Sequence, residues 1–207
     1  MNAKVVPFNP LDKRNLADSI ARTLIAQQAR SFDELQSFSG AGLYAIYYSG
    51  DFPCYRRLAE ANSGADPRWP IYVGKASTAG TRKGGLLGDT VSGKPLLGRL
   101  REHQESLIAA SSTLKIEDFR CRSLVVDDLW IALGEALLIS QYSPVWNQLL
   151  DGFGNHDPGK GRHEGLAPRW DLLHPGRAWA AKLRPRTETA GLVSAEIEQF
   201  LAALPLP

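Results

Sequence analysis

Two short β-rich segments, each with a tyrosine close to a glycine, constrain the fold of this chain most strongly. Residues 42–48 read GLYAIYY and residues 70–76 read PIYVGKA. Strand side chains alternate between two faces, so an antiparallel pairing of the segments would hold Tyr44 and Tyr72 close together. A tyrosine in a strand usually serves packing alone. Whether these tyrosines have a structural or a chemical role therefore has to be judged from the rest of the chain.

Hydrophobic periodicity elsewhere predicts one more strand and several helices around this pair. The strand is expected at residues 119–126. Ser31 and Glu34 have the spacing of a capping box, which predicts a short helical turn before the first tyrosine strand. Helices are expected at residues 15–29, 53–62, 96–111, 129–140 and 193–204.

The composition is that of an ordinary globular protein. The chain has 207 residues, 43% hydrophobic and 22% charged, and no apolar run approaches the roughly 20 residues that span a bilayer. The N-terminus lacks the apolar core of a secretory signal, so we expect a cytoplasmic protein with no membrane partner. Cys54 and Cys121 are too isolated for a disulfide framework or a zinc site.

Positive charge is concentrated in two blocks although the formal net charge is only +2. Residues 75–101 contain six Lys or Arg against one acid, and residues 159–186 contain seven against two. Two basic blocks on an otherwise acidic body favour one cationic surface for a polyanion such as DNA. The alternative is two solvated loops that never meet in space.

One segment imitates a nucleotide-binding loop. Residues 88–95, GDTVSGKP, fit the phosphate-loop pattern except at the last position. Pro95 offers neither a hydroxyl for magnesium nor a backbone N–H for phosphate, and no strand leads into the segment. The sequence therefore disfavours nucleotide binding.

Polar residues in the predicted helices are candidates for chemistry. Arg99 and His103 are four residues apart and share a helix face. Glu135 is the only charge in a helix whose apolar residues cover nearly its whole circumference, so we expect that helix to be buried. A buried carboxylate needs a partner. Glu135 is therefore expected either to pair with a cation such as Arg99 or to open into a cleft and bind metal. Asn147 also needs hydrogen-bond partners in its apolar stretch.

Taken in order, these features resemble a known family. The chain resembles the GIY-YIG nuclease superfamily in an ordered set, namely Gly42-Leu43-Tyr44, Tyr72-Val73-Gly74, Arg99, His103, Glu135 and Asn147. Leu43 and Val73 replace the usual isoleucines. The segments between the tyrosine motifs and before Arg99 are longer than in most members.

The resemblance implies an α+β fold, with a small three-stranded antiparallel sheet flanked by helices. It divides the chain into an N-terminal arm and helix (1–40), a nuclease domain (41–150) with an insertion (51–69), and a C-terminal DNA-binding extension (151–207). The extension, a basic loop and helices, is expected to be part of the same compact unit.

Two later segments narrow the resemblance. DGFGNHDPGKGR, from residue 151, and HPGRAWA, from residue 174, look like the type II restriction endonuclease branch that cuts the palindrome CCGCGG. This implies double-stranded DNA as substrate and a homodimer as the active form. The insertion at residues 51–69 is our candidate for the dimer interface. A cognate DNA methyltransferase is expected in the same system, but not as a stable partner.

The resemblance also implies roles for individual residues. Glu135 would hold one Mg²⁺, for which Mn²⁺ would substitute. Tyr44 would act as general base toward water, with His103 taking its proton. Arg99 would bind the phosphate oxygens, and Tyr72 and Asn147 would position phosphate or water. The predicted DNA contacts are Lys75, Arg82, Lys83, Lys94, Arg101, Asn155, His156, Lys160 and Arg162.

Two other functions stay open from the sequence. A repair or homing nuclease of the same superfamily would usually carry a separate DNA-binding or partner domain, for which this chain is short. A DNA-binding module without catalysis would fit the charge distribution but would leave Glu135 unexplained.

Overall fold

An antiparallel sheet forms the centre of the protein. The computed structural model describes residues 9, 11–77, 93–159 and 164–207. The strands lie in the order β1-β4-β2-β3. Three of them were predicted, and the fourth, two-residue β1 on the edge of β4 is too short to show periodicity. The bounds are β1 (Arg30–Ser31), β2 (Gly42–Tyr48), β3 (Tyr72–Ala76) and β4 (Phe119–Val125).

The central strand β2 is buried along its whole length, because it pairs with β3 on one side and β4 on the other. Its alternation is as predicted. Tyr44, Ile46 and Tyr48 enter one hydrophobic cluster. Leu43 and Ala45 enter a second cluster on the opposite face.

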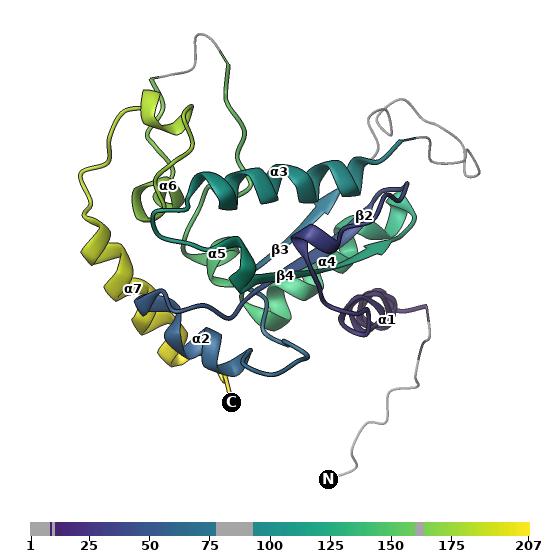
Figure 1. The fold of residues 1–207 in the computed structure, drawn as a ribbon. Helices are drawn as coiled ribbons and strands as arrows, with labels where there is room; N and C mark the ends of the chain where they lie inside the picture. Colours follow the sequence, from purple (N-terminus) through teal and green to yellow (C-terminus); the bar gives the residue numbers. More distant parts are fainter. Residues whose placement is uncertain (1–8, 10, 78–92, 160–163) are drawn as a thin grey trace.

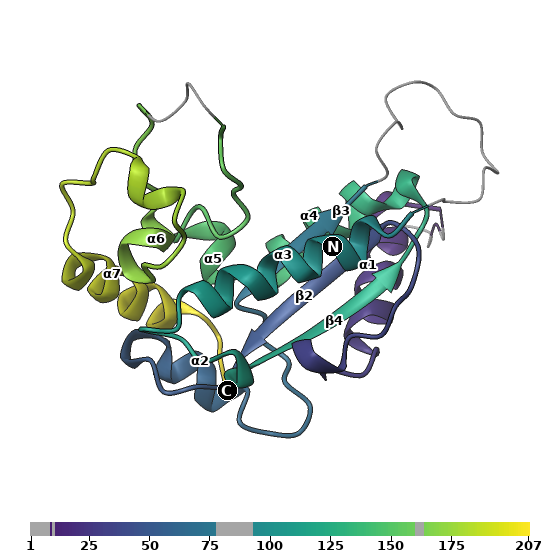
Figure 2. The same cartoon turned by 45° about the horizontal axis from the view of Figure 1, so that its top comes forward.

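Helices cover both faces of the sheet (Figures 1 and 2). On the face of Leu43, α1 (Lys13–Ile25) packs against α4 (Asp128–Tyr142). On the face of Tyr44, α3 (Pro95–Ala109) runs along the sheet, as Figure 2 shows. Pro95 is in the first turn of α3, where a proline needs no N–H partner. The rest of the phosphate-loop-like segment, apart from Gly93 and Lys94, lies outside the described residues.

The C-terminal segment shares the core of α3. Trp170, Val193 and Ile197 belong to the same buried cluster as Tyr44 and Tyr48. The helices of this part of the chain are α5 (Val145–Gln148), α6 (Arg169–Leu173) and α7 (Ala190–Ala203). Short 3₁₀ helices are η1 (Phe32–Glu34), whose capping box is present as predicted, η2 (Pro53–Tyr55), η4 (Ile116–Asp118) and η5 (Ala180–Lys182).

The expectation that α4 is buried all round was wrong. Its buried stripe is Ile131, Gly134 and Leu138, whereas Leu129 is 65% exposed. The helix packs mainly against the sheet and α1, with Tyr142 near its end meeting Trp69, and its outer side carries the apolar residues Leu129, Ala132 and Ala136 in place of charges. An apolar sequence around a helix thus did not require neighbours on every side.

The insertion between the tyrosine motifs folds back onto the C-terminus. It forms η2 and α2 (Arg56–Ala61), and its Tyr55 and Leu58 are buried in the cluster shared with α7. Arg57 donates hydrogen bonds to the carbonyls of Ala202 and Leu204. The apolar side chains of Tyr55 and Leu58 thus serve the core of the chain, and the insertion as a dimer interface stays a prediction.

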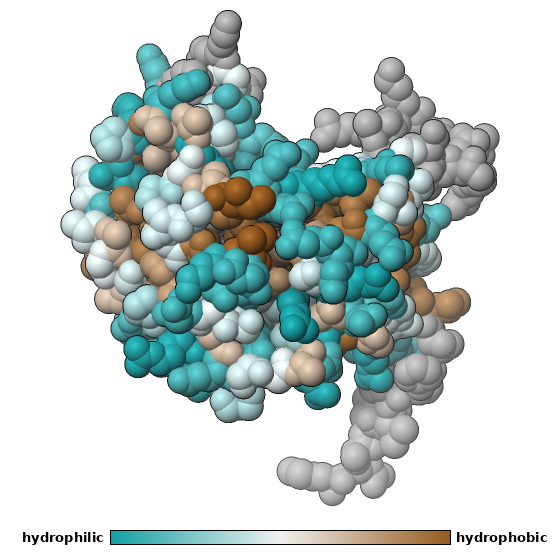
Figure 3. Space-filling view, in the orientation of Figure 1, coloured by the Kyte–Doolittle hydropathy of each residue, from teal (hydrophilic) through white to brown (hydrophobic). Residues whose placement is uncertain are grey.

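The exterior is polar over most of the face seen in Figure 1. In Figure 3 this face is largely hydrophilic, with hydrophobic side chains gathered near the C-terminal half of α3, where Ile108 is 53% exposed. Among the described residues, every helix is too short or too polar to cross a membrane.

A buried chain of hydrogen bonds joins the insertion to α5 and the C-terminal segment. The Trp146 indole N–H donates to the Tyr55 hydroxyl (2.9 Å), which lies 2.8 Å from His174 Nε2. The other nitrogen, Nδ1, lies 3.0 Å from the Thr113 hydroxyl. A neutral imidazole satisfies this chain, accepting at Nε2 and donating at Nδ1. Burial lowers the pKa of His174 to about 3.

We predict that acid destabilises the fold through this histidine. Its pKa falls from an ordinary 6.5 to about 3 on folding, so between these pH values unfolding takes up a proton. The free energy of unfolding should therefore fall as the pH drops through this range, by about 1.4 kcal/mol per unit. In urea denaturation at several pH values, the free energy of unfolding of His174→Gln should depend less steeply on pH than that of the wild type. Equal slopes would contradict the assignment.

Candidate active site

The two motif tyrosines come close together because the residue of β3 opposite Tyr44 is a glycine, which has no side chain. Tyr44 on β2 lies opposite Gly74 on β3. A Cβ atom at Gly74 would lie 2.3 Å from the Tyr44 hydroxyl oxygen and 2.4 Å from Cζ. The phenol therefore lies against bare backbone, and its ring centroid is 6.1 Å from that of Tyr72.

His103 meets the Tyr44 hydroxyl from α3. The oxygen lies 2.6 Å from His103 Nε2, and both side chains are buried. Burial, reinforced by the positive charge of Arg99, lowers the pKa of His103 well below its ordinary value. Burial likewise raises the pKa of the Tyr44 phenol, with Tyr72 adding to the effect and Arg99 opposing it. At neutral pH the phenol therefore keeps its proton and donates it to an uncharged imidazole.

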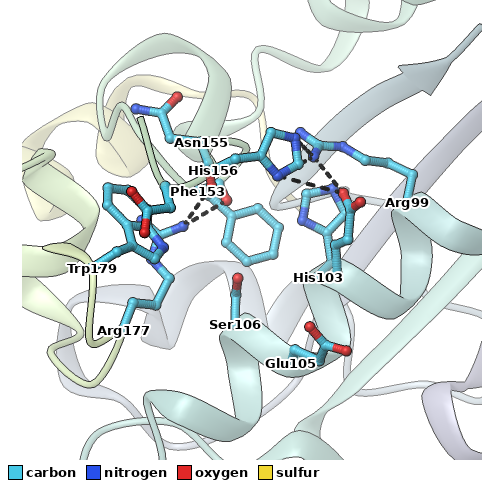
Figure 4. Close-up of a pocket in the computed structure, with 11 residues that line it drawn as sticks. Arg99, His103, Glu105, Ser106, Phe153, Asn155, His156, Arg177 and Trp179 are labelled. Atoms are coloured by element: carbon cyan, nitrogen blue, oxygen red, sulfur yellow. Dashed lines mark hydrogen bonds and ion pairs between the residues drawn. The ribbon is translucent and has the colours of Figure 1, made fainter. Parts of the chain in front are cut away.

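Arg99 lies one helical turn before His103 and contacts the loop that follows α5. Its guanidinium donates to the Gly154 carbonyl, pairs with Glu102 at 2.8 Å, and contacts the His156 ring (Figure 4). His156 and Asn155 were predicted as DNA contacts. Both are exposed, and the contact between the His156 ring and Arg99 is at the surface.

Phe153, from the same loop, was missed by sequence reasoning. Its ring stacks on His103 with centroids 4.4 Å apart and planes 15° from parallel (Figure 4). It also meets the Tyr72 ring nearly at right angles, with the two centroids 5.0 Å apart. A single phenylalanine in a Gly-rich loop has no periodicity that would mark it. Only the return of the loop over α3 brings it to the site.

Glu135 approaches from the opposite face of the sheet. Its Oε2 lies 2.6 Å from Lys75 Nζ, so the cation that pairs with it is Lys75, where the sequence predicted either a cation such as Arg99 or a metal. The two side chains are 20% and 43% exposed, respectively, so this is a pair at the surface and not a dry internal one. The Glu135 charge also contributes to the raised pKa of Tyr72, which burial dominates.

These groups converge because β3 is an edge strand. Tyr72 and Lys75 point to opposite faces, so residues from both faces reach the site around this edge. Asn147 closes the edge: its amide accepts from the Val73 N–H and donates to the Val73 carbonyl, both at 2.8 Å. Asn147 thus has the hydrogen-bond partners that its apolar stretch requires, and its role toward phosphate or water stays a prediction.

The remaining residues that were predicted to contact DNA do not lie close to these groups where the structure describes them. Lys94 donates to the Ser37 hydroxyl, and Arg101 is exposed on α3. Arg82, Lys83, Lys160 and Arg162 lie outside the described residues. Their roles at DNA stay predictions.

The donor set suits a magnesium ion completed by substrate. Within the described parts of the chain, no group of three His, Cys, Asp or Glu residues could hold a metal. Glu135 would be the protein's carboxylate ligand, and it is accessible from solvent. Magnesium commonly uses one or two carboxylates together with water and substrate phosphates. The residues therefore fit such an ion, and Lys75 would have to yield the carboxylate oxygen.

Beside these groups is a cavity of about 230 Å³ between α3 and the C-terminal segment. It opens next to Arg99 and His103, and Figure 4 shows Phe153 and Trp179 along its wall. Of the site residues, Arg99 and His103 thus border this open space, while the Tyr44 side chain is buried behind them.

Comparison with known families supports the restriction-enzyme branch. Residues 36–201 match the family model described as the Eco29kI GIY-YIG domain. The chain belongs to this family. None of the curated protein sequences compared with it matches.

Membership confirms the GIY-YIG prediction and the α+β fold. The Eco29kI family is a family of type II restriction enzymes, so the protein is a nuclease whose substrate is DNA. The family match runs through the insertion, the Gly-rich loop and most of α7. The C-terminal segment therefore belongs to the Eco29kI-type domain.

We predict that Gly74→Ala disables the site without unfolding the protein. The added methyl group collides with the Tyr44 phenol and should pull its hydroxyl away from His103, lowering DNA cleavage by about 100-fold. Gly98→Ala is the matched control, because a Cβ there meets nothing within 4 Å. Cleavage rate and melting temperature should be measured together. Wild-type cleavage by a folded Gly74→Ala protein would contradict the prediction.

Proposed function

We propose that the protein is a magnesium-dependent type II restriction endonuclease that hydrolyses phosphodiester bonds in a palindromic site, CCGCGG by resemblance. The observation that carries the proposal is the 2.6 Å contact between the Tyr44 hydroxyl and His103 Nε2, with Arg99 beside it. A phenol that can pass its proton to a neutral imidazole suits a general base.

The proton path runs through these two residues. Water attacks phosphorus and gives a proton to the Tyr44 oxygen while the phenol proton moves to His103 Nε2. The new P–O bond forms as the bond to the 3′ oxygen breaks. The imidazolium is poorly tolerated beside Arg99, so the negative charge gathering on the phosphate has to compensate it.

Two groups would meet the phosphate. The Arg99 guanidinium, whose side chain is partly buried, can donate to non-bridging oxygens when it leaves its contacts with His156 and Glu102. Glu135 would hold Mg²⁺, which when bound polarises the phosphate and stabilises the departing oxygen. Lys75, released from Glu135, would turn to a phosphate. Asn147 acts indirectly by holding the edge of β3 that carries Tyr72.

Cleavage tests the proposal directly. A plasmid with one CCGCGG site should be linearised with Mg²⁺ and left intact with chelator, and a plasmid lacking the site should stay uncut. We expect Glu135→Gln to bind the site with near wild-type affinity but to cut about 100-fold more slowly or not at all. Gel-shift and cleavage assays on the same preparation make the comparison.

Tyr44→Phe distinguishes a role of Tyr44 as general base from a role in packing alone. It keeps the ring against Gly74 but removes the oxygen that lies 2.6 Å from His103, so cleavage should fall by about 100-fold. Tyr48→Phe is a matched control on the same strand, because its hydroxyl accepts from the Phe52 N–H away from the site. Near wild-type turnover by Tyr44→Phe would reject the base role.

Cutting both strands of a palindrome with one site per chain calls for two copies. The outer face of α4 supports this proposal, because Leu129, Ala132 and Ala136 form an exposed apolar stripe. A second copy related by two-fold symmetry would cover such a stripe.

We predict that sedimentation with cognate DNA shows two protein chains per duplex. Leu129→Glu should weaken that assembly and reduce double-strand cutting, while Leu192→Glu, at a comparably exposed leucine on α7, should not. A single chain bound to DNA in both wild type and Leu129→Glu would count against the dimer.

A further inference from the structure

Arg177 is a buried cation outside the residues with a proposed chemical role. It is 5% exposed, and its guanidinium forms a two-point ion pair with Asp171, in which Nε lies 2.7 Å from Oδ1. Its remaining donors reach three backbone carbonyls, those of Gly152 (2.9 Å), Phe153 (3.1 Å) and Asn155 (3.3 Å). The guanidinium is thereby fully engaged.

Two indole rings set the plane of this guanidinium. Its central carbon lies 4.6 Å from the Trp170 ring and 4.6 Å from the Trp179 ring. Such stacking, combined with a planar fork of donors, is a property of arginine that lysine lacks. The site requires this side chain, and not merely a positive charge.

The three carbonyls belong to the loop that covers the active site. Between them, Phe153 stacks on His103 and the Gly154 carbonyl accepts from Arg99. The loop is also closely fitted, because a Cβ at Gly154 would lie 2.6 Å from the Tyr72 hydroxyl. A small displacement of the loop would therefore disturb its contacts with three site residues at once, namely Tyr72, Arg99 and His103.

We propose that Arg177 is a positioning residue for cleavage. It holds residues 152–155 in one conformation, so that Phe153 keeps the His103 ring aligned with Tyr44 and Gly154 keeps Arg99 in place. The cleavage part of this inference rests on the proposed function, but the effect on His103 does not.

The environment of His103 provides a direct readout. Loosening the loop would let water reach the imidazole and raise its pKa toward the ordinary value. Activity that needs a neutral His103 would then be lost at a higher pH as the solution is acidified. The titratable and charged groups that face this ring are Tyr44, Tyr72, Arg99, His156 and Arg177.

Arg177→Lys tests the proposal, since it keeps the charge but loses the fork and the stacking. Arg122→Lys is the matched control. Arg122 is 1% exposed, donates to the carbonyls of Gln27 and Pro67, pairs with Asp66 and lies 4.7 Å from the Tyr47 ring centroid. It lies opposite Ala45 and over Tyr47, on the other face of the sheet from Tyr44 and His103.

Single-turnover cleavage, DNA affinity without metal, and melting temperature should be measured for both variants. We expect Arg177→Lys to cut about 100-fold more slowly, with a much smaller change in DNA affinity and with the acidic limb of its rate–pH profile moved to higher pH. Arg122→Lys should keep the wild-type profile while it is folded. Equal effects of the two substitutions, or a wild-type profile in folded Arg177→Lys, would overturn the proposal.

NMR titration of the His103 imidazole without DNA or metal separates this inference from the nuclease proposal. Its pKa should rise in Arg177→Lys and stay unchanged in Arg122→Lys, whether or not the protein cuts DNA. If Arg177→Lys does not fold, Phe153→Leu tests the link between the loop and His103, because it keeps an apolar side chain but loses the flat stack on His103. An unchanged His103 titration in folded Phe153→Leu would overturn the proposal.

Discussion

The close approach of a phenol to bare backbone is the constraint on which the site depends. Tyr44 can reach His103 only because Gly74, its partner across the strands, has no side chain. That approach places the hydroxyl under α3, in a region dry enough to keep His103 neutral and Tyr44 protonated. The acid–base pair thus follows from strand register together with one missing Cβ.

Around this pair the protein brings together two faces of one sheet. Tyr44, His103 and Arg99 lie on the α3 side, while Lys75 and Glu135 lie on the α4 side. They can serve one substrate because β3 is a short edge strand that both sets flank. The Asn147 amide occupies the outward N–H and carbonyl of Val73 on that edge, where another strand could otherwise pair.

The C-terminal segment belongs to this arrangement as much as the motif residues do. Its loop contacts residues of α3 through Phe153 and Gly154. Arg177, whose guanidinium lies against two indole rings, holds this loop. The His174 chain joins the same segment to the insertion through Tyr55. The elements that lengthen this chain relative to a minimal domain therefore build its core and the wall of its site.

The sequence alone determined the strands and main helices of the domain, because alternation and helical periodicity are local properties of the chain. It also determined the family, since the order and spacing of the motif residues survive without coordinates. Tertiary structure decided what those residues contact: Lys75 as the partner of Glu135, Phe153 on His103, and an α4 left open on one side. Such contacts join residues far apart in sequence, and their geometry is set by how helices and loops pack on the sheet, which no local pattern encodes.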